Sequence, residues 1–430
     1  MLNKVKFVFY TNSVSAHQLP LARELVARLG ADNYQYVYTG SLLQGGGQEV
    51  VSPEPWIVQE WVDGRMSKAE LRIDKNSTVQ SKELLETCDI LMVGGLRPIE
   101  LIERRAEKGL KTFYCTELWF KPLELGVGGR CWCRLPGRVR MLVLRYRRMA
   151  KQFVNWLKND PHARCFVIGP WAKKDMLWLG VPESKIVDWG YFVEKGLGVR
   201  NERLGVRRNI RVLWVGRMLD WKRVDTIVRA VALANMKLEK EVGVGDLRKD
   251  FEKKVEKIGG EEKGVRGQEL GVRFQLTLVG DGPEKERLLK LAERLDAKNK
   301  KETETPLSTS SSFLHLLPPV PIAEVRTLMR EHDIYVLASN AEEGWGAALN
   351  EAMEEGMTCF GTYEAGASAA LLPRSNLFHA GDWRALADLL VAFAEEKIEH
   401  PLSTSTSFLH LLPHAYTPAG AADKLMELIK

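Results

Sequence analysis

Short apolar runs alternate with amphipathic stretches along this chain, and the whole alternation occurs twice. Lys4–Tyr10 and Ile210–Val215 have the length and composition of buried strands, whereas Ala16–Leu29 places its leucines on one side of a helix. Strands that alternate with helices form a parallel sheet covered on both faces. A chain of 430 residues is also longer than one hydrophobic core usually serves. The pattern therefore predicts an α/β protein with two doubly wound parallel-sheet domains.

The boundary between the two domains is expected in a stretch rich in Gly, Arg and Glu, between Glu194 and Arg208. We therefore predict a first domain over residues 1–200 and a second over residues 209–413. The last stretch, 414–430, has the pattern of a short helix, and we expect its apolar face to pack back on the first domain.

Three stretches of the second domain are longer than connections between elements usually are, near residues 239–272, 297–312 and 397–413. Pro306–Pro318 recurs almost unchanged as Pro401–Pro413. Two copies do not make a solenoid, so we interpret them as inserts in surface connections. The first copy is expected to supply a core strand, and the second a loose or edge segment.

Two carboxylates, Glu343 and Glu351, stand eight positions apart in the segment EGWGAALNE. The first is expected in a turn after the strand Ile334–Leu337, and the second in the helix that follows. The N–H groups of a helix that starts near Gly346 suit an anion, and Gly344 lets the backbone approach a phosphate closely. Glu343 can accept hydrogen bonds from sugar hydroxyls and Glu351 from ribose hydroxyls. The alternative is that both are solvated charges near a helix start.

A second pattern places two cations after the first strand of the second domain. Gly216 and Arg217 follow this strand, and Lys222 comes five residues after Arg217. Open α/β sheets bind ligands at the carboxyl ends of their strands, and a guanidinium with an ammonium suits a diphosphate. The alternative is a pair of ordinary surface cations. A third and weaker pattern, Gly280–Pro283, predicts a tight turn after the next strand.

In this order the three patterns resemble glycosyltransferase family 4 of the GT-B fold, also called glycosyl transferases group 1. The resemblance covers residues 210–390 well and the first half of the chain more loosely. In the first half, Tyr114–Pro122 and Asp188–Val193 look like segments of bacterial members that build surface polysaccharides and lipopolysaccharide. Two departures are the long connection before the strand Phe274–Val279 and the insert that supplies Phe313–Leu317.

The resemblance implies two Rossmann-like domains that face each other across a cleft, and a sugar transfer that retains the anomeric configuration without a metal or another cofactor. Arg217 and Lys222 would neutralise the departing diphosphate, Glu343 would contact the donor sugar, and Glu351 would hold the ribose. The remaining donor-binding positions are at the base or at the turns beside the phosphates: Val320, Gly216, Gly344, Trp345, Gly346 and Ala347. The expected donor is a nucleoside-diphosphate sugar with a hexosyl-type group, UDP being favoured.

Two residues of the first domain are candidates for the acceptor side. His17 follows the first strand at the edge where ligands bind, and Glu117 follows the strand Thr112–Cys115. Either side chain can contact an acceptor hydroxyl. The alternatives are a capping or exposed histidine and a structural salt bridge of the glutamate.

Segment 130–158 is rich in Arg and Lys, contains no acidic residue, and has aromatic and aliphatic residues interleaved. It predicts a basic amphipathic helix with a preceding loop, suited to an anionic membrane or to a phosphate-bearing lipid. The alternative is an ordinary helix with a solvated basic face. The net charge of +6 fits any anionic partner, but no nucleic-acid motif accompanies the segment, so we expect no nucleic acid.

The six cysteines are scattered, and we interpret them as reduced thiols of a cytoplasmic protein. No run of 18 apolar residues predicts a membrane span. We therefore expect a glycosyltransferase at the inner face of the plasma membrane, acting on a glycan or glycolipid in bacterial cell-surface polysaccharide synthesis. The alternatives are a non-catalytic nucleotide-sugar-binding protein and a membrane-surface interaction protein.

Overall fold

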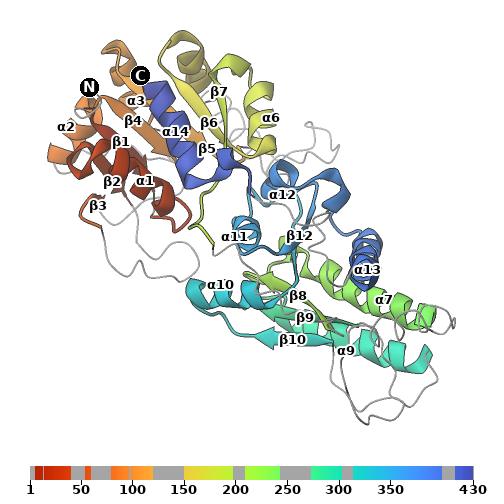
Figure 1. Ribbon diagram of the computed structural model, residues 1–430. Helices are drawn as coiled ribbons and strands as arrows, with labels where there is room; N and C mark the ends of the chain where they lie inside the picture. Colours follow the sequence, from red (N-terminus) through yellow and green to blue (C-terminus); the bar gives the residue numbers. More distant parts are fainter. Residues whose placement is uncertain are drawn as a thin grey trace. The chain divides into compact units, whose positions relative to one another are not determined.

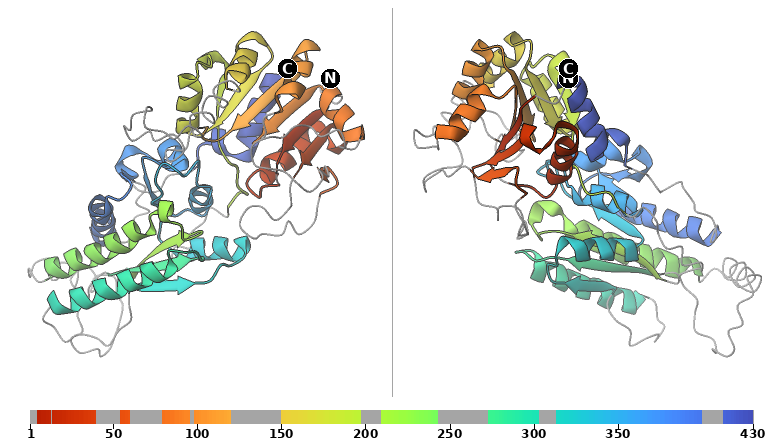
Figure 2. Two further views of the ribbon diagram at one scale, coloured as in Figure 1. Left: turned by 180° about the vertical axis from the view of Figure 1, so that it is seen from behind. Right: turned by 60° about the vertical axis from the view of Figure 1, so that its left-hand side comes forward.

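The structure is a computed structural model that describes residues 5–12, 14–39, 54–59, 79–95, 98–119, 150–196, 209–242, 273–302, 313–399 and 412–429. The chain forms two compact units, one of Met1–Glu194 with Pro413–Lys430 and the other of Lys195–Leu412. Each unit is built on a parallel sheet with helices beside it, as Figures 1 and 2 show. The predicted α/β class with two parallel sheets is confirmed.

The sheet of the first unit has, in the described ranges, seven strands in the order β3-β2-β1-β4-β5-β6-β7. Its strands are β1 (Phe7–Thr11), β2 (Tyr34–Tyr38), β3 (Ile57–Gln59), β4 (Ile90–Gly94), β5 (Lys111–Thr116), β6 (Arg164–Ile168) and β7 (Ile186–Trp189). Its labelled helices are α1 (Leu19–Leu29), α2 (Val79–Thr87), α3 (Ile99–Glu107), α6 (Pro170–Trp178) and α14 (Pro418–Ile429). The strand order reverses at β1, which is where doubly wound sheets open a crevice.

The ends of α1 follow from its sequence. The helix begins later than the predicted Ala16, because the residues before Leu19 form a turn in which the Gln18 N–H donates to the Ser15 carbonyl at 3.0 Å. Pro20 lies in the first turn, where its missing N–H costs nothing. Gly30 ends the helix at a φ of +89°, a conformation that glycine adopts without strain.

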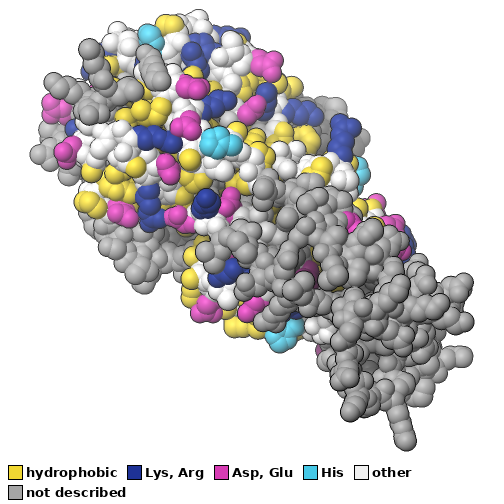
Figure 3. Space-filling view, in the orientation of Figure 1, with side chains coloured by type: hydrophobic (Ala, Val, Ile, Leu, Met, Phe, Trp, Pro, Cys, Tyr) yellow, Lys and Arg dark blue, Asp and Glu magenta, His cyan; other side chains and the backbone are white. Residues whose placement is uncertain are grey.

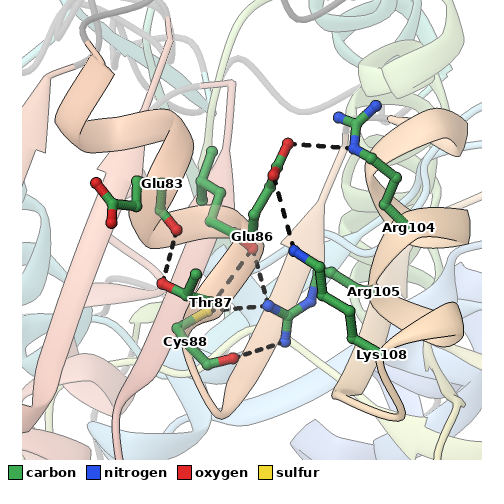
Figure 4. A network of polar contacts seen from close by, with 8 residues as sticks. Glu83, Glu86, Thr87, Cys88, Arg104, Arg105 and Lys108 are labelled. Carbon is green, nitrogen blue, oxygen red and sulfur yellow. Dashed lines mark hydrogen bonds and ion pairs between the residues drawn. The ribbon is translucent and has the colours of Figure 1, made fainter.

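A buried guanidinium ties four segments of the first unit together, and Figure 4 shows its contacts with Cys88 after α2. Arg105 is fully buried and donates to the carbonyls of Leu85, Cys88 and Lys111 at 2.8, 3.0 and 2.9 Å, and to Thr112 Oγ1 at 3.0 Å. These partners lie at the end of α2, before β4 and at the start of β5. Burial raises the pKa of the neighbouring Cys88 thiol to about 11. The arginine therefore acts as a structural clamp that uses neutral acceptors.

The C-terminal helix α14 is part of the first unit. Ala421 and Leu425 are fully buried, and α14 lies against α1. Lys111 Nζ donates to the Ile429 carbonyl at 2.8 Å, and Arg28 pairs with Asp423 at 3.0 Å.

The second unit has, among its described residues, a six-stranded sheet in the order β10-β9-β8-β11-β12-β13. Its strands are β8 (Asn209–Val215), β9 (Arg273–Val279), β10 (Leu314–Leu317), β11 (Ile334–Leu337), β12 (Thr358–Thr362) and β13 (Leu377–Phe378). Its helices are α7 (Val224–Val242), α9 (Lys285–Glu302), α10 (Ile322–Glu331), α11 (Ala348–Glu354), α12 (Gly366–Leu371) and α13 (Trp383–Glu399).

The inserts predicted in the second unit fall mainly outside the described residues, at 243–272, 303–312 and 400–411. The C-terminal ends of helices α7, α9 and α13 extend into the first residues of the three predicted inserts. The first copy of the repeat supplies β10, a half-buried strand at the edge of the sheet. On the face that Figure 3 shows, cationic and anionic side chains are interspersed over the described surface.

Candidate active site

The strands of the second sheet end in one row, which brings their following loops to a common edge. Val215 pairs with Val279, and Val279 pairs in turn with Leu317. Tyr335 pairs with Leu213, so β11 ends level with β8. Because all these strands are parallel, the loops after β8, β9, β10 and β11 lie at the carboxyl edge, where open α/β sheets bind ligands.

The turn after β9 packs directly on the loop after β8, and its glycines permit this approach. Gly280 has a φ of +139°, and a Cβ there would lie 1.9 Å from the carbonyl oxygen of Gly216. A Cβ on Gly282 would lie 2.5 Å from the carbonyl oxygen of Met218. The Met218 N–H donates to the Asp281 carbonyl at 2.8 Å. The glycine turn therefore fixes the start of the loop that carries both predicted cations.

Lys222 and Glu343 form an ion pair at this edge, although they are far apart in the sequence. Lys222 ends the short 3-10 helix Asp220–Lys222, and its ammonium lies 4.3 Å from the centre of the Trp221 ring. Glu343 is 8% exposed. The ammonium is therefore held by a ring and a carboxylate, and a bound anion would compete with the carboxylate for it.

Two buried hydroxyls support Glu343 from the side of the sheet. Ser339 Oγ donates to Glu343 Oε2 at 2.9 Å, and Thr362 Oγ1 donates to the Ser339 carbonyl at 2.6 Å. Both Ser339 and Thr362 are fully buried. Sequence reasoning did not single out either residue. The signal for Ser339 was its place four residues before Glu343, directly after β11.

Glu351 lies buried in α11. Glu351 and Glu343 both affect the pKa of Tyr335 in β11. Burial raises the pKa of Tyr335 well above its usual value, and the carboxylates of Glu343 and Glu351 raise it further. The Tyr335 phenol therefore keeps its proton and lies close enough to feel both charges. Both predicted carboxylates thus act electrostatically on one tyrosine of β11.

The backbone between the two carboxylates is shaped by small residues. Gly346 has a φ of +98°, and a Cβ on Gly366 would lie 2.1 Å from the Gly344 carbonyl oxygen. Helix α11 begins at Ala348, and its N-cap residue Ala347 makes no side-chain cap. Ala347 therefore offers no side chain that would cap the first N–H groups of α11. An anion site at the start of a helix needs such uncapped N–H groups.

Three predicted donor residues differ in their exposure. The Trp345 side chain is buried, and its Nε1 donates to Asn350 Oδ1 at 2.9 Å, so its ring belongs to the core. Arg217 is exposed in the loop after β8, and Val320 is half-buried in the loop after β10. Both loops lie at the same carboxyl edge as the Lys222–Glu343 pair.

The acceptor-side candidates of the first unit meet at one side chain, Tyr191, which follows β7. The Tyr191 hydroxyl donates to Glu117 Oε1, and the rings of His17 and Tyr191 have centres 6.1 Å apart. The Phe192 N–H donates to the His17 carbonyl at 2.8 Å. Burial raises the pKa of Tyr191 well above its usual value, and the Glu117 carboxylate raises it further. Sequence reasoning placed Tyr191 in a family-like segment but did not name it as a site residue.

The predicted basic helix lies outside the described residues up to position 149. Residues 150–159 are helical, with Phe153 and Leu157 buried and Lys151 and Lys158 exposed, so this part is amphipathic. Within the described ranges, no helix is both long and apolar enough to cross a bilayer. No three His, Cys, Asp or Glu side chains in the same ranges form a group that could hold a metal ion.

Residues 244–396 match the family model described as "Glycosyl transferases group 1". This range contains Gly280–Pro283, Glu343 and Glu351, whereas Arg217 and Lys222 precede it. No curated protein matches the sequence significantly.

Three solved structures have a similar fold over nearly the whole chain. The apo form of the lipopolysaccharide outer core galactosyltransferase WaaB has a TM-score of 0.56 at 13% identity, covering 99% of each chain. HepE from Anabaena in complex with UDP has a TM-score of 0.54 at 13% identity, covering 99% of this chain and 97% of that chain. WaaG, a glycosyltransferase involved in lipopolysaccharide biosynthesis, has a TM-score of 0.52 at 14% identity, covering 97% of this chain and 99% of that chain.

Proposed function

We infer that this chain, a glycosyltransferase with the GT-B fold, moves a hexosyl-type group from a nucleoside-diphosphate sugar to a glycan or glycolipid acceptor with retention of configuration. The observation that carries this inference is the Lys222–Glu343 pair at the carboxyl edge of the second sheet. An ammonium suits the diphosphate of such a donor, and a neighbouring carboxylate suits its sugar hydroxyls. Lys222 therefore suits the diphosphate of the donor, and Glu343 suits its sugar.

Charge stabilisation by cations would drive the transfer. Arg217 and Lys222 would neutralise the negative charge that develops on the departing diphosphate, while Glu343 orients the sugar and Glu351 holds the ribose. Because two side-chain cations serve this leaving group, we propose that no metal or other cofactor takes part. The loss of one such preorganised charge costs about 3 kcal/mol of transition-state stabilisation.

UDP is the nucleotide that we favour, because HepE was solved with UDP and WaaB is a galactosyltransferase. We propose an acceptor in bacterial surface-polysaccharide or lipopolysaccharide synthesis, as for WaaB and WaaG. In the first unit, His17, Glu117 and Tyr191 offer an imidazole, a carboxylate and a phenol beside one another for an acceptor hydroxyl.

We place the enzyme in the cytoplasm, in peripheral contact with the membrane where a glycolipid acceptor would lie. The exposed Lys151 and Lys158 belong to the basic segment 130–158 and support this proposal. Nucleic acid is not among the proposed partners.

A thermal-shift panel with UDP, GDP, ADP and CMP tests the donor site. A ligand at a hundred times its Kd stabilises the fold by about 2.7 kcal/mol, so UDP should raise the Tm of the wild type. Arg217→Ala should weaken the shift, because an exposed cation that contacts phosphate is lost while the fold is kept. Lys290→Ala, which removes an exposed cation from α9, is the matched control and should keep the shift. The proposal is wrong if no nucleotide stabilises the well-folded wild type.

A further inference from the structure

We infer that the end of α6, together with the cations around the neighbouring turn 158–164, docks on an anionic lipid surface. We call this surface the α6 patch, and it consists of Lys158, Arg164, Lys174, Leu177, Trp178 and Lys185. The inference deepens the proposed membrane contact and rests on it, because it assigns that contact to a described surface of which Lys158 alone belongs to the basic segment 130–158.

Two consecutive apolar side chains protrude at the end of α6. Leu177 is 42% exposed and Trp178 is 69% exposed. Among the described residues, one other large apolar side chain is exposed, Leu289 in the second unit, and it is less exposed than either at 36%. An indole has an apolar body and one polar N–H, which makes tryptophan a residue of the bilayer interface.

The outer side of α6 combines aromatic and cationic groups. Trp171, Lys174 and Trp178 are three and four residues apart, so they lie on one side of the helix. Lys174 Nζ lies 5.7 Å from the centre of the Trp171 ring. Ala172 and Met176 are buried on the opposite side. The helix therefore presents a face with the composition of an interfacial helix.

Three further cations gather beside the end of α6. Lys158 Nζ lies 3.6 Å from the place that a Cβ of Gly180 would take, just after the helix. Lys185 Nζ and an Arg164 guanidinium nitrogen both donate to the Pro161 carbonyl, at 3.1 and 2.9 Å. Lys158 therefore adjoins the end of α6, and Lys185 and Arg164 meet at the turn that follows Lys158 in the chain.

Nearby acidic groups already have other partners. Asp160 is buried, and its carboxylate accepts the indole N–H of Trp156 at 3.0 Å. Glu183 and Asp188 pair with Lys173 at 3.5 and 3.3 Å, on a neighbouring side of α6.

The cations of the patch also act on one another. Burial lowers the pKa of Lys185 and the guanidinium of Arg164 lowers it further, while the Asp160 carboxylate raises it. Such repulsion between like charges is relieved when an anion approaches. The turn therefore holds positive charge that a phosphate can neutralise.

An anionic bilayer satisfies both parts of the α6 patch. Lipid phosphates pair with the cations, and the indole of Trp178 and the side chain of Leu177 insert into the interfacial region. Nucleic-acid phosphates would take the cations but would leave Leu177 in water. Each cation near an anionic surface contributes about fivefold in affinity.

Vesicle co-sedimentation of the full chain tests this inference, with phosphatidylcholine vesicles that contain or lack phosphatidylglycerol. The wild type should bind only the anionic vesicles. Trp178→Ser should weaken binding on the order of tenfold, because the indole no longer enters the interface. Lys174→Gln, which leaves segment 130–158 unchanged, should weaken it by about fivefold, since one cation is lost. Leu289→Ser removes an exposed apolar side chain elsewhere and should bind like the wild type.

The inference is wrong if both α6-patch variants bind anionic vesicles as tightly as the wild type, in which case segment 130–158 alone would make the proposed contact. It is also wrong if the wild type binds a DNA duplex in preference to vesicles, or binds neither. The UDP-induced rise in Tm, measured on the same samples, reports folding and the donor site separately.

Discussion

At the scale of single residues, Glu343 illustrates how a carboxylate is prepared before a ligand arrives. Lys222 and Ser339 both contact its Oε2 atom. Oε1 is therefore the oxygen that we expect to accept a hydrogen bond from the donor sugar. A carboxylate that is fixed through one oxygen loses little conformational freedom when its other oxygen binds a ligand. This small entropic cost is the benefit of a preorganised site.

Replacing Ser339 by alanine should slow sugar transfer more than it weakens the fold. A hydrogen bond to a charged group contributes about 1.5–3 kcal/mol, so kcat should fall by roughly 10- to 100-fold. The measurement is the steady-state rate of UDP release from the UDP-sugar, with Tm followed in parallel.

Ser368→Ala is the matched control for this substitution. Ser368 is a fully buried serine of the same unit whose Oγ has no hydrogen-bond partner among the described residues. Its removal should therefore leave kcat and Tm nearly unchanged. Equal rates for Ser339→Ala and the wild type would contradict the positioning role of Ser339.

The candidate site residues that the sequence predicts are those whose residue types stand at a recognisable local spacing. Lys222 and Glu343 each follow a strand that the apolar pattern predicts, so a shared edge could be expected for them. Thr362 and Tyr191 act through residues far away in the chain, Ser339 and Glu117. Nothing local distinguishes them from other buried hydroxyls, and only the fold shows which group each one faces.

At the scale of elements, His332 fastens the end of α10 to strand β9. Its Nδ1 lies 2.7 Å from the Leu328 carbonyl, which can only accept, so Nδ1 carries the proton. Its Nε2 lies 2.9 Å from Thr277 Oγ1 and therefore accepts from that hydroxyl. Burial lowers the pKa of His332 from its ordinary value of 6.5. The neutral imidazole is thus the form that both contacts require.

This histidine should make the protein less stable in mild acid. The unfolded chain binds a proton at the histidine below about pH 6.5, whereas the folded protein binds it only at lower pH. The free energy of unfolding should therefore be constant above this pH and fall as the pH is lowered from 6.5 toward the depressed folded pKa.

Denaturant titrations of the wild type and His332→Gln between pH 5 and pH 8 measure this effect. The variant should be less stable at pH 8, because a packed pair of hydrogen bonds is disturbed. Its stability should nevertheless depend less on pH over this range. Parallel pH profiles for the two proteins would show that His332 does not cause the dependence.

The elements that the sequence predicted best are the buried strands, because both of their faces are apolar. Strand β8, for example, coincides closely with the predicted Ile210–Val215. Strand β3 has only three residues, Ile57–Gln59, and is too short to show a periodicity. Helix α7 extends to Val242, into the stretch 239–272 that the sequence predicts to be an insert.

At the scale of the whole molecule, the predicted fold class is confirmed, and the first unit is made of two pieces of chain. The helix α14 belongs with Met1–Glu194, although the whole second unit separates them in the sequence. Leu425 is fully buried in this unit, and Lys111 at the start of β5 donates to the Ile429 carbonyl. The stability of the first sheet should therefore depend on α14.

Leu425→Ala should destabilise the first unit selectively. A buried leucine truncated to alanine costs about 2–5 kcal/mol. Hydrogen exchange should accelerate in peptides of β1 and β5, while peptides of β8 and β11 keep their protection. Leu289→Ala, at an exposed position of α9, should change neither set. A uniform acceleration in both units after Leu425→Ala would show that they do not unfold separately.

The place of α14 in the chain also sets an order of events on the ribosome. Strands β1 to β7 are synthesised before Lys195–Leu412, and α14 is synthesised only afterwards. At roughly 5–20 residues per second, the nascent first unit spends on the order of ten seconds or more without its last helix. During this interval the side of α1 that α14 later covers is open to chaperones. All residues of the second unit are synthesised before α14. The second unit can therefore fold while the first unit still lacks α14.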